Sequence, residues 1–228
     1  MPALNSLEPI VAGIKDGTVV PYLGPGVLNG VTDRLNKQPI PADSDSLILA
    51  MNDGKPMAPR LMYEFARAAM NLEQKKGRKF IERFLVKTYS ERKWTDSPFH
   101  QWLALLQPKY LIDINRDTQM QQFYADREHL LIVGMARIAG TQYRFKLYQY
   151  GNQKYTEVDL NAANSNLPIL FKPMGTPLPE ANFIASDADY VDYITELMGG
   201  FAIPDFLKKY RVGKKYLFLG MRFLRDTE

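Results

Sequence analysis

Hydrophobic and polar positions follow two different spacings along the chain, and their alternation predicts alternating strands and helices. Short, nearly continuous apolar runs predict buried strands at 18–24, 109–114, 129–133, 168–172 and 215–220. Apolar residues spaced by three and four predict helices near 6–17, 61–72, 80–85, 97–108, 186–198 and 203–210. This order predicts an α/β fold with a mainly parallel sheet and helices on both of its faces.

Turn and cap residues set the expected limits of several elements. Ser6 is expected to cap the first helix and Gly17 to end it, while Ser97 caps a helix whose first residue is Pro98. Residues 143–158 alternate between apolar and polar and predict a hairpin that turns at Gly151 and the following Asn. Residues 29–57 have a weak, turn-rich pattern, which predicts loops.

Composition narrows the class of protein. The 228 residues are 46% hydrophobic and 12% aromatic, which is typical of a folded globular domain. The absence of Cys excludes a disulfide, a thiolate nucleophile and a cysteine-ligated zinc. No apolar run is long enough to span a bilayer, and the start, MPALNSLEPI, lacks the blocks of a signal peptide. We therefore expect a cytoplasmic protein without a membrane partner.

The excess of Lys and Arg over Asp and Glu bears on the class of partner. The net charge is +4, and Lys and Arg gather in 73–79, 206–215 and near the end of the chain. Such clusters suit a nucleotide, a nucleic acid or an acidic protein, or they form a solvated helix face. No RNA-binding aromatic motif, zinc finger or helix-turn-helix pattern is present, so nucleic acid is not an expected partner.

The stretch TVVPYLGPGVLNG raises the first question of chemistry. Gly24 and Gly26 follow a predicted strand directly, and glycine lets a phosphate group approach the backbone closely. Pro25 between them lacks the amide that a phosphate would use. By itself the motif is therefore equally compatible with a phosphate loop and with a plain turn.

The order of four strand ends, YLGPG, DINRD, LFKPMG and LFLGMR, resembles that of the sirtuin superfamily, particularly its zinc-free and often defence-associated bacterial branch. Asn115 and Asp117 in DINRD match the family's Thr-x-Asn-x-Asp strand end. SPFHQWLALL resembles its helix start, and FIASDADYVDYI and YLFLGMRFLRD resemble its later motifs, the last retaining Gly220 and Asp226. The resemblance extends from about residue 19 to residue 226, and the order of the motifs carries it.

The resemblance implies a single Rossmann-like domain over residues 1–228, with a helical insertion at about 40–95. It also implies a pocket for NAD or an ADP-ribose-type nucleotide, and no metal. Asn115 would bind the ribose beside nicotinamide or a water there, and Asp117 would meet the carboxamide or orient the loop. The cofactor-binding positions implied in this way are Gly24, Gly26, Asn115, Asp117, Gly175, Gly220 and Arg222.

One departure affects the implied chemistry. Met174 stands where the family has the histidine that serves as general base, and a thioether cannot accept a proton. Loss of a positioned base typically slows a reaction by about 100- to 10,000-fold. Deacylation is therefore not expected. Arg222 also replaces a small serine, so the pocket is expected to hold its ligand differently or to be filled by its own side chains.

Simpler structural roles stand beside each of these assignments. Asn115 is placed equally well to cap a helix beginning near Thr118, and Asp117 favours the same helix N-terminus. His100 is more typical of a packed, hydrogen-bonded histidine than of a catalytic one, and His129 is expected to be structural or exposed.

Three functional hypotheses remain open. The first is a degenerate sirtuin-like domain that binds NAD or a related nucleotide with weak or no hydrolysis. The second is a non-catalytic protein-interaction module that has lost the ligand and acts through a protein partner or a homo-oligomer. The third is an active NAD glycohydrolase in which Asn115 and Asp117 position water.

Overall fold

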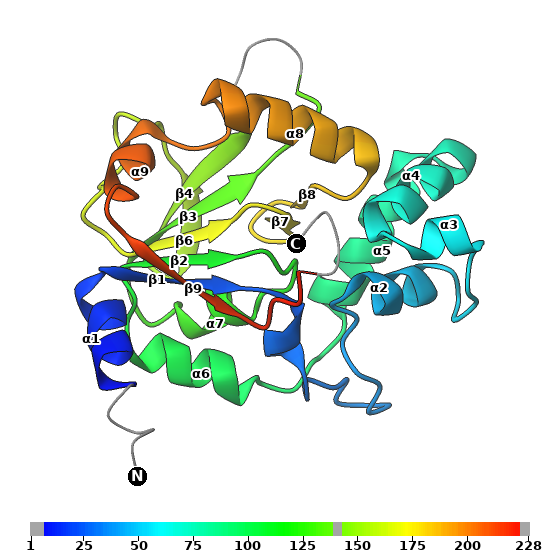
Figure 1. Ribbon diagram of the computed structural model, residues 1–228, viewed down its shortest axis with the longest axis horizontal. Helices are drawn as coiled ribbons and strands as arrows, with labels where there is room; N and C mark the ends of the chain where they lie inside the picture. The colour runs from blue at the N-terminus through cyan, green and yellow to red at the C-terminus, as the bar shows by residue number, and fades with distance from the viewer. Residues whose placement is uncertain (1–6, 139–142, 224–228) are drawn as a thin grey trace.

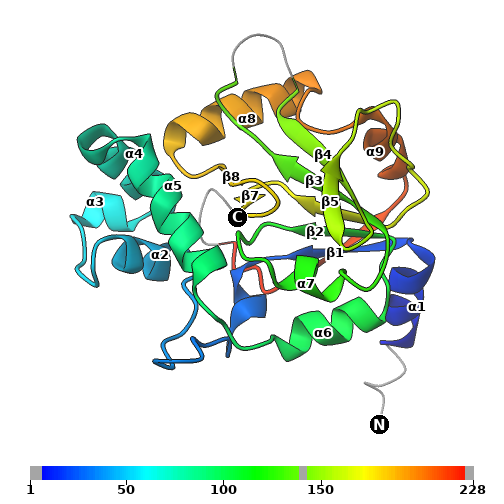
Figure 2. The ribbon, with the colours of Figure 1, turned by 180° about the vertical axis from the view of Figure 1, so that it is seen from behind.

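A seven-stranded, mainly parallel sheet forms the centre of the molecule, as the sequence predicts. The computed structural model describes residues 7–138 and 143–223, so the expected cap Ser6 and the motif residue Asp226 lie outside the described residues. The strand order is β5–β4–β3–β6–β2–β1–β9, and β4 alone runs antiparallel to the other strands, since it pairs antiparallel with both β3 and β5 (Figures 1 and 2). The strands are β1 (Val19–Leu23), β2 (Tyr110–Asp113), β3 (His129–Gly134), β4 (Phe145–Gly151), β5 (Lys154–Glu157), β6 (Ile169–Lys172) and β9 (Lys215–Leu219).

Helices cover both faces of this sheet, which confirms the layered α/β prediction (Figures 1 and 2). Neighbouring strand residues belong to different cores: Leu111 packs in one apolar cluster, and Tyr110 packs in the other. Burial on both faces explains why the strands appear as continuous apolar runs. On one face lie α1 (Glu8–Asp16), α6 (Pro98–Leu105) and α7 (Gln119–Phe123), and on the other lie α8 (Asp187–Gly199) and α9 (Asp205–Tyr210).

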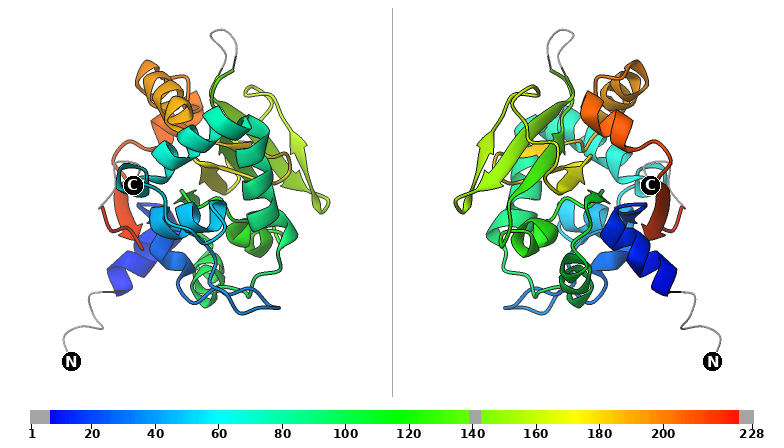
Figure 3. Two further views of the ribbon diagram at one scale, coloured as in Figure 1. Left: turned by 90° about the vertical axis from the view of Figure 1, so that its right-hand side faces the viewer. Right: turned by 90° about the vertical axis from the view of Figure 1, so that its left-hand side faces the viewer.

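A group of helices, here called the helical module, lies beside the carboxyl ends of the strands (Figures 1 and 3). It comprises α2 (Ser44–Met51), α3 (Pro59–Met62), α4 (Phe65–Lys76), α5 (Arg78–Val86) and the π-helical turn η2 (Lys87–Glu91). The sequence pattern predicts loops where α2 lies. The helix is only eight residues long, and it forms because Asp43 accepts a hydrogen bond from Ser46 N while Leu47 and Ile48 are buried.

The expected caps are present where the structure describes them. Gly17 ends α1 with φ of 82°, a left-handed conformation that glycine adopts easily. Ser97 Oγ accepts a hydrogen bond from the amide of His100, 3.3 Å away, at the start of α6. The hairpin of β4 and β5 turns at Asn152 and Gln153, both with positive φ, which is one residue later than predicted.

His129 at the start of β3 is structural. Its ring is buried, with Nδ1 3.0 Å from the carbonyl of Arg127 and Nε2 2.8 Å from the hydroxyl of Tyr155. A carbonyl only accepts, so Nδ1 carries the proton and Nε2 accepts from the tyrosine. Tyr150 stacks on the ring with centroids 5.1 Å apart. Burial lowers the pKa of His129 to about 4.

Two short strands, β7 (Gly175–Thr176) and β8 (Asn182–Phe183), form a separate small sheet after β6. They place the chain that leads into α8 next to the helical module. Within the described residues, no helix has the length and apolar character needed to cross a membrane.

Candidate functional site

The strand ends that carry the candidate residues meet at one edge of the sheet, next to the helical module (Figure 1). Asn115 is buried there, just beyond β2. Its Nδ2 donates to the carbonyl of Gly24, 3.1 Å away, and to Asp113 Oδ1, 3.0 Å away. Asn115 therefore ties the loop after β1 to the end of β2, and it does not cap α7.

A buried ion pair joins β2 to β6 beside Asn115. Lys172 Nζ lies 2.7 Å from Asp113 Oδ2 and 2.8 Å from the carbonyl of Asp117, and neither charged side chain is exposed. Burial raises the pKa of Asp113, and the ammonium group of Lys172 opposes that rise. We call Asp113, Asn115, Asp117 and Lys172 the carboxyl-end cluster.

Lys172 and Asp113 are not among the site residues predicted from the sequence. A signal was present, because each is the one charged residue at the end of an apolar run, YLID and ILFK, and the two charges are opposite. Charged groups are rarely buried unless they are paired, so two adjacent parallel strands with these endings suggest an ion pair. That β2 and β6 are adjacent, however, is known only from the sheet order.

Asp117 and His100 retain unsatisfied polar atoms. Asp117 Oδ1 accepts from the amide of Gln119 at 2.8 Å, whereas its Oδ2 is buried without a hydrogen-bond partner. His100 Nδ1 lies 2.7 Å from Ser97 Oγ, and its Nε2 is likewise buried without a partner. Burial lowers the pKa of His100, and the negative charge of Asp117 opposes this change. A packed position for His100 agrees with the simpler expectation.

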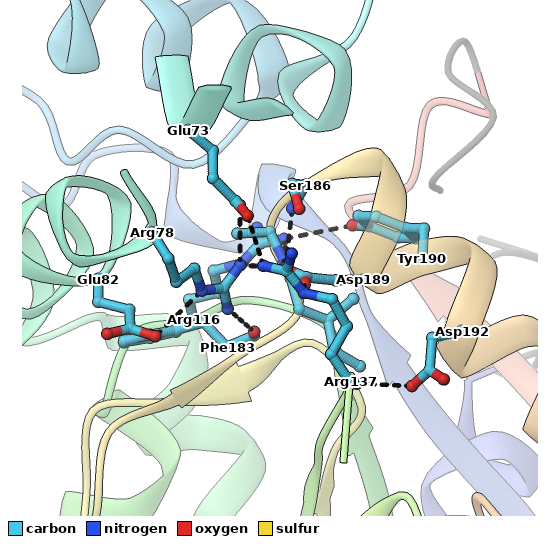
Figure 4. Close-up of polar contacts among 12 residues, drawn as sticks. Glu73, Arg78, Glu82, Arg116, Arg137, Phe183, Ser186, Asp189, Tyr190 and Asp192 are labelled. Carbon is cyan, nitrogen blue, oxygen red and sulfur yellow. Dashed lines mark hydrogen bonds and ion pairs between the residues drawn. The ribbon is translucent and has the colours of Figure 1, made fainter. Parts of the chain in front are cut away.

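Arg116, between the two candidate residues, is held by neighbouring groups. Its guanidinium donates to the carbonyl of Ile184, with Nη2 2.6 Å away, and to the hydroxyl of Tyr190, 3.2 Å away. Its Cζ lies 5.2 Å from the centre of the Phe65 ring, in the helical module. Figure 4 shows Arg116 and Tyr190 among the polar contacts between the helical module and the start of α8. Its charge therefore links β2 to α8 and the module.

The glycines of the loop after β1 accommodate β9. The amide of Gly24 donates to the carbonyl of Leu219 at 2.8 Å, and that of Gly26 donates to the carbonyl of Gly220 at 2.9 Å. A Cβ added to Gly24 or to Gly26 would lie 2.9 Å from the Gly220 carbonyl oxygen, closer than side chains normally pack. Gly220 itself has φ of 70°. The backbone at the end of β9 therefore lies directly against the loop after β1.

Two further predicted positions lie apart from the cluster. Gly175 begins β7 with φ of 87°, and a Cβ there would collide with the carbonyl of Asn182 across the small sheet. Arg222 is on the surface, with a side chain that is 58% exposed and 3.9 Å from Asp43 Oδ2. Neither residue shares a hydrogen bond with the carboxyl-end cluster in the described part of the chain.

The cavity at the predicted nucleotide position is small. Its volume is about 40 Å³, and its lining includes Pro25, Asn115, Arg116, Met174 and Tyr190. Pockets for small molecules usually have volumes of about 300–1,000 Å³, whereas a water takes about 30 Å³. Met174, at the position where the resemblance implies a histidine, lines this cavity, whose volume is closer to that of a water molecule than to that of a small-molecule pocket.

Larger cavities lie nearby and on the opposite side of the sheet. One of about 460 Å³ has Arg34, Arg92, Lys93, Trp94 and Asp117 in its lining. Another, of about 1,100 Å³, lies between β4 and the 157–162 segment, far along the sheet order from β2. Among the described residues, no group of three side chains is arranged to hold a metal ion.

An ionic network holds the helical module against the strand ends (Figure 4). Asp189, which is 1% exposed, binds Arg78 of α5 and Arg137, whose Nε lies 2.7 Å from Oδ1. Arg137 also reaches Glu73 of α4 at 2.7 Å, and Arg78 donates to the carbonyl of Phe183 at 2.8 Å. We call Glu73, Arg78, Arg137 and Asp189 the module seam. The seam thus joins α4 and α5 of the helical module to the start of α8.

Comparison with protein-family models and with curated protein sequences gives no match for this chain.

Proposed function

We propose that this protein is a non-catalytic, sirtuin-like α/β domain that acts by binding another protein. The observation that carries the proposal is the lack of space at the carboxyl ends of the strands. The cavity there measures about 40 Å³, and the amides of Gly24 and Gly26 already donate to the carbonyls of Leu219 and Gly220. The charge of Arg116 is likewise bound by the Ile184 carbonyl and the Tyr190 hydroxyl. A ligand would have to displace several internal contacts at once.

The missing base supports the same proposal. Met174 lines the cavity and cannot take a proton from a ribose hydroxyl. The nearest histidine in the chain's folded core, His100, is fully buried, and burial lowers its pKa. Proton transfer from the ribose hydroxyl requires an accessible group that titrates near neutrality, and neither Met174 nor His100 supplies one.

The test is thermal unfolding with NAD and with ADP-ribose, together with an assay for released nicotinamide. A ligand at about 100 times its dissociation constant would stabilise the fold by about 2.7 kcal/mol. We expect no shift and no nicotinamide. The variant Met174→His restores the absent base, and we expect it to remain inactive because the cavity stays closed. Activity in that variant, or a shift with NAD that Asn115→Ala removes, would contradict the proposal.

A second candidate function is nucleotide binding at the neighbouring cavity. The observation that favours it is Asp117 Oδ2, which is buried without a partner in the wall of the cavity of about 460 Å³. Arg92 and Lys93 on the same cavity are exposed cations that suit phosphate oxygens. A thermal shift with ADP-ribose that is lost in Arg92→Glu but retained in Asn115→Ala would select this candidate.

A further inference from the structure

β9 forms one edge of the sheet, and within the described residues only β1 pairs with it. The amide of Lys215 and the carbonyl of Leu219 both bond toward the β1 side. Backbone groups alternate between the two sides of a strand, so Tyr216 and Phe218 direct their N–H and C=O groups outward. These four groups form a template to which another strand can bond.

Exposed aromatic side chains lie beside this template. Phe218 is 49% exposed and Phe223 is 62% exposed, and their ring centroids are 5.3 Å apart. The ring of Phe218 also lies 5.2 Å from that of Tyr22 on β1. An added strand would therefore gain apolar contacts from its side chains as well as backbone hydrogen bonds.

The chain segment that contains β9 is basic. Residues 206–223 contain no Asp or Glu, and their basic residues are Lys208, Lys209, Arg211, Lys214, Lys215 and Arg222. Two of these residues lie close to carboxylates outside this range, Lys208 to Asp205 and Arg222 to Asp43, and the others give the segment its excess of positive charge. The opposite edge, β5, differs, because it carries Lys154 and Glu157 and the latter lies 3.4 Å from Lys146.

We propose that the β9 edge binds an extended, acidic segment of a partner protein as an added strand, an inference that rests on the proposed protein-binding function. Acidic residues in the segment would face Lys215 and its basic neighbours, and apolar residues would cover Phe218. A second copy of this chain fits less well, since two edges with the same basic charge repel each other. The segment is defined by its chemistry: extended, acidic and apolar at alternate positions.

The experiment uses a synthetic peptide of about ten residues in which Glu and Val alternate. Amide NMR spectra of the protein are recorded with peptide up to about 1 mM, a concentration that detects weak binding. The amides of Tyr216 and Phe218 should shift. Phe218→Asp should weaken binding by tenfold or more, about 1.4 kcal/mol. The matched control is Ile194→Asp on α8, whose side chain is equally exposed at 50% and which should leave binding unchanged.

Two methylated peptides separate strand addition from simple charge attraction. One carries methyl groups on its Val nitrogens and the other on its Glu nitrogens. In an added strand only one of these sets faces β9, so one peptide should bind and the other should fail. Equal binding of both peptides would overturn the proposal. So would an absence of shifts at the highest concentration, or full binding by Phe218→Asp.

Two further measurements complete the test: the oligomeric state of the protein, and the thermal shift of the Phe218→Asp variant with nucleotides. A stable dimer whose formation Phe218→Asp prevents would mean that a second copy occupies the edge, which also overturns the proposal. NAD and ADP-ribose are added to the same Phe218→Asp variant, since Phe218 is not part of the small cavity. A thermal shift there refutes the proposed function, whereas failure of the peptide alone refutes only the β9 site.

Discussion

The carboxyl-end cluster and the module seam both use charged side chains, but they differ in their exposure to water. In the cluster, Lys172 and Asp113 are completely buried. In the seam, Asp189 is 1% exposed while Arg78 and Arg137 are 27% and 37% exposed. A buried pair loses most of its hydration, so each partner depends on the other. The seam arginines keep part of their hydration, and removing their partner should cost less.

This difference bears on the function of the carboxyl ends of the strands. A site kept for a ligand usually leaves some charge or hydrogen-bonding capacity for that ligand. In the cluster, Lys172 and Asn115 are bonded to protein groups, and the unsatisfied atoms are buried at Asp117 and His100. The bonds of Lys172 and Asn115 connect the strand ends, much as the seam connects the module to α8, whereas Asp117 Oδ2 remains an unused acceptor.

The largest effect should come from breaking the buried pair. Lys172→Met leaves Asp113 charged and uncompensated in the core, and we expect the free energy of unfolding to fall by about 3–5 kcal/mol. Urea denaturation measures this change. The double variant Lys172→Met with Asp113→Asn removes both charges and should recover part of the loss. A loss below about 1 kcal/mol would mean that the pair does not hold the strand ends.

A smaller loss is expected at the seam. Asp189→Asn removes the charge that binds Arg78 and Arg137, and the free energy of unfolding should fall by about 3 kcal/mol or less. The matched control is Asp96→Asn, which breaks the surface pair with Arg34, where both side chains are more than half exposed. That control should cost about 0–1 kcal/mol. Equal losses in the two variants would show that Asp189 adds no more than a surface ion pair.

The sequence predicts the sheet and its helices well because these features are local. Buried strands such as 168–172 appear as apolar runs, and caps such as Ser97 lie within three residues of their targets. Lys172 and Asp113 are 59 residues apart in the chain, and no local pattern encodes their pairing. The sequence likewise shows that Gly24 and Gly26 need space, but not that Gly220 fills it.

The smallest predicted effect is a loss of unfolding free energy in acid. It arises in the sheet and not in the module seam, so it separates the two regions. His129 is buried, and its pKa of about 4 is lowered from the ordinary value of 6.5. The folded state therefore binds fewer protons than the unfolded state between these values. The stability that this neutral histidine contributes is complete above pH 6.5 and is lost as the pH falls toward 4.

Between pH 7 and pH 5 this single group should lower the free energy of unfolding by about 2 kcal/mol. Urea titrations of the wild type and of His129→Gln at several pH values measure it. The variant should show a flatter pH dependence, with the remainder due in part to His100, whose pKa burial lowers in the same direction. No histidine belongs to the seam, so Asp189→Asn should retain the slope that His129 causes. An unchanged slope in His129→Gln would mean that the ring already carries its charge in the folded protein, against the donor and acceptor contacts that hold it neutral.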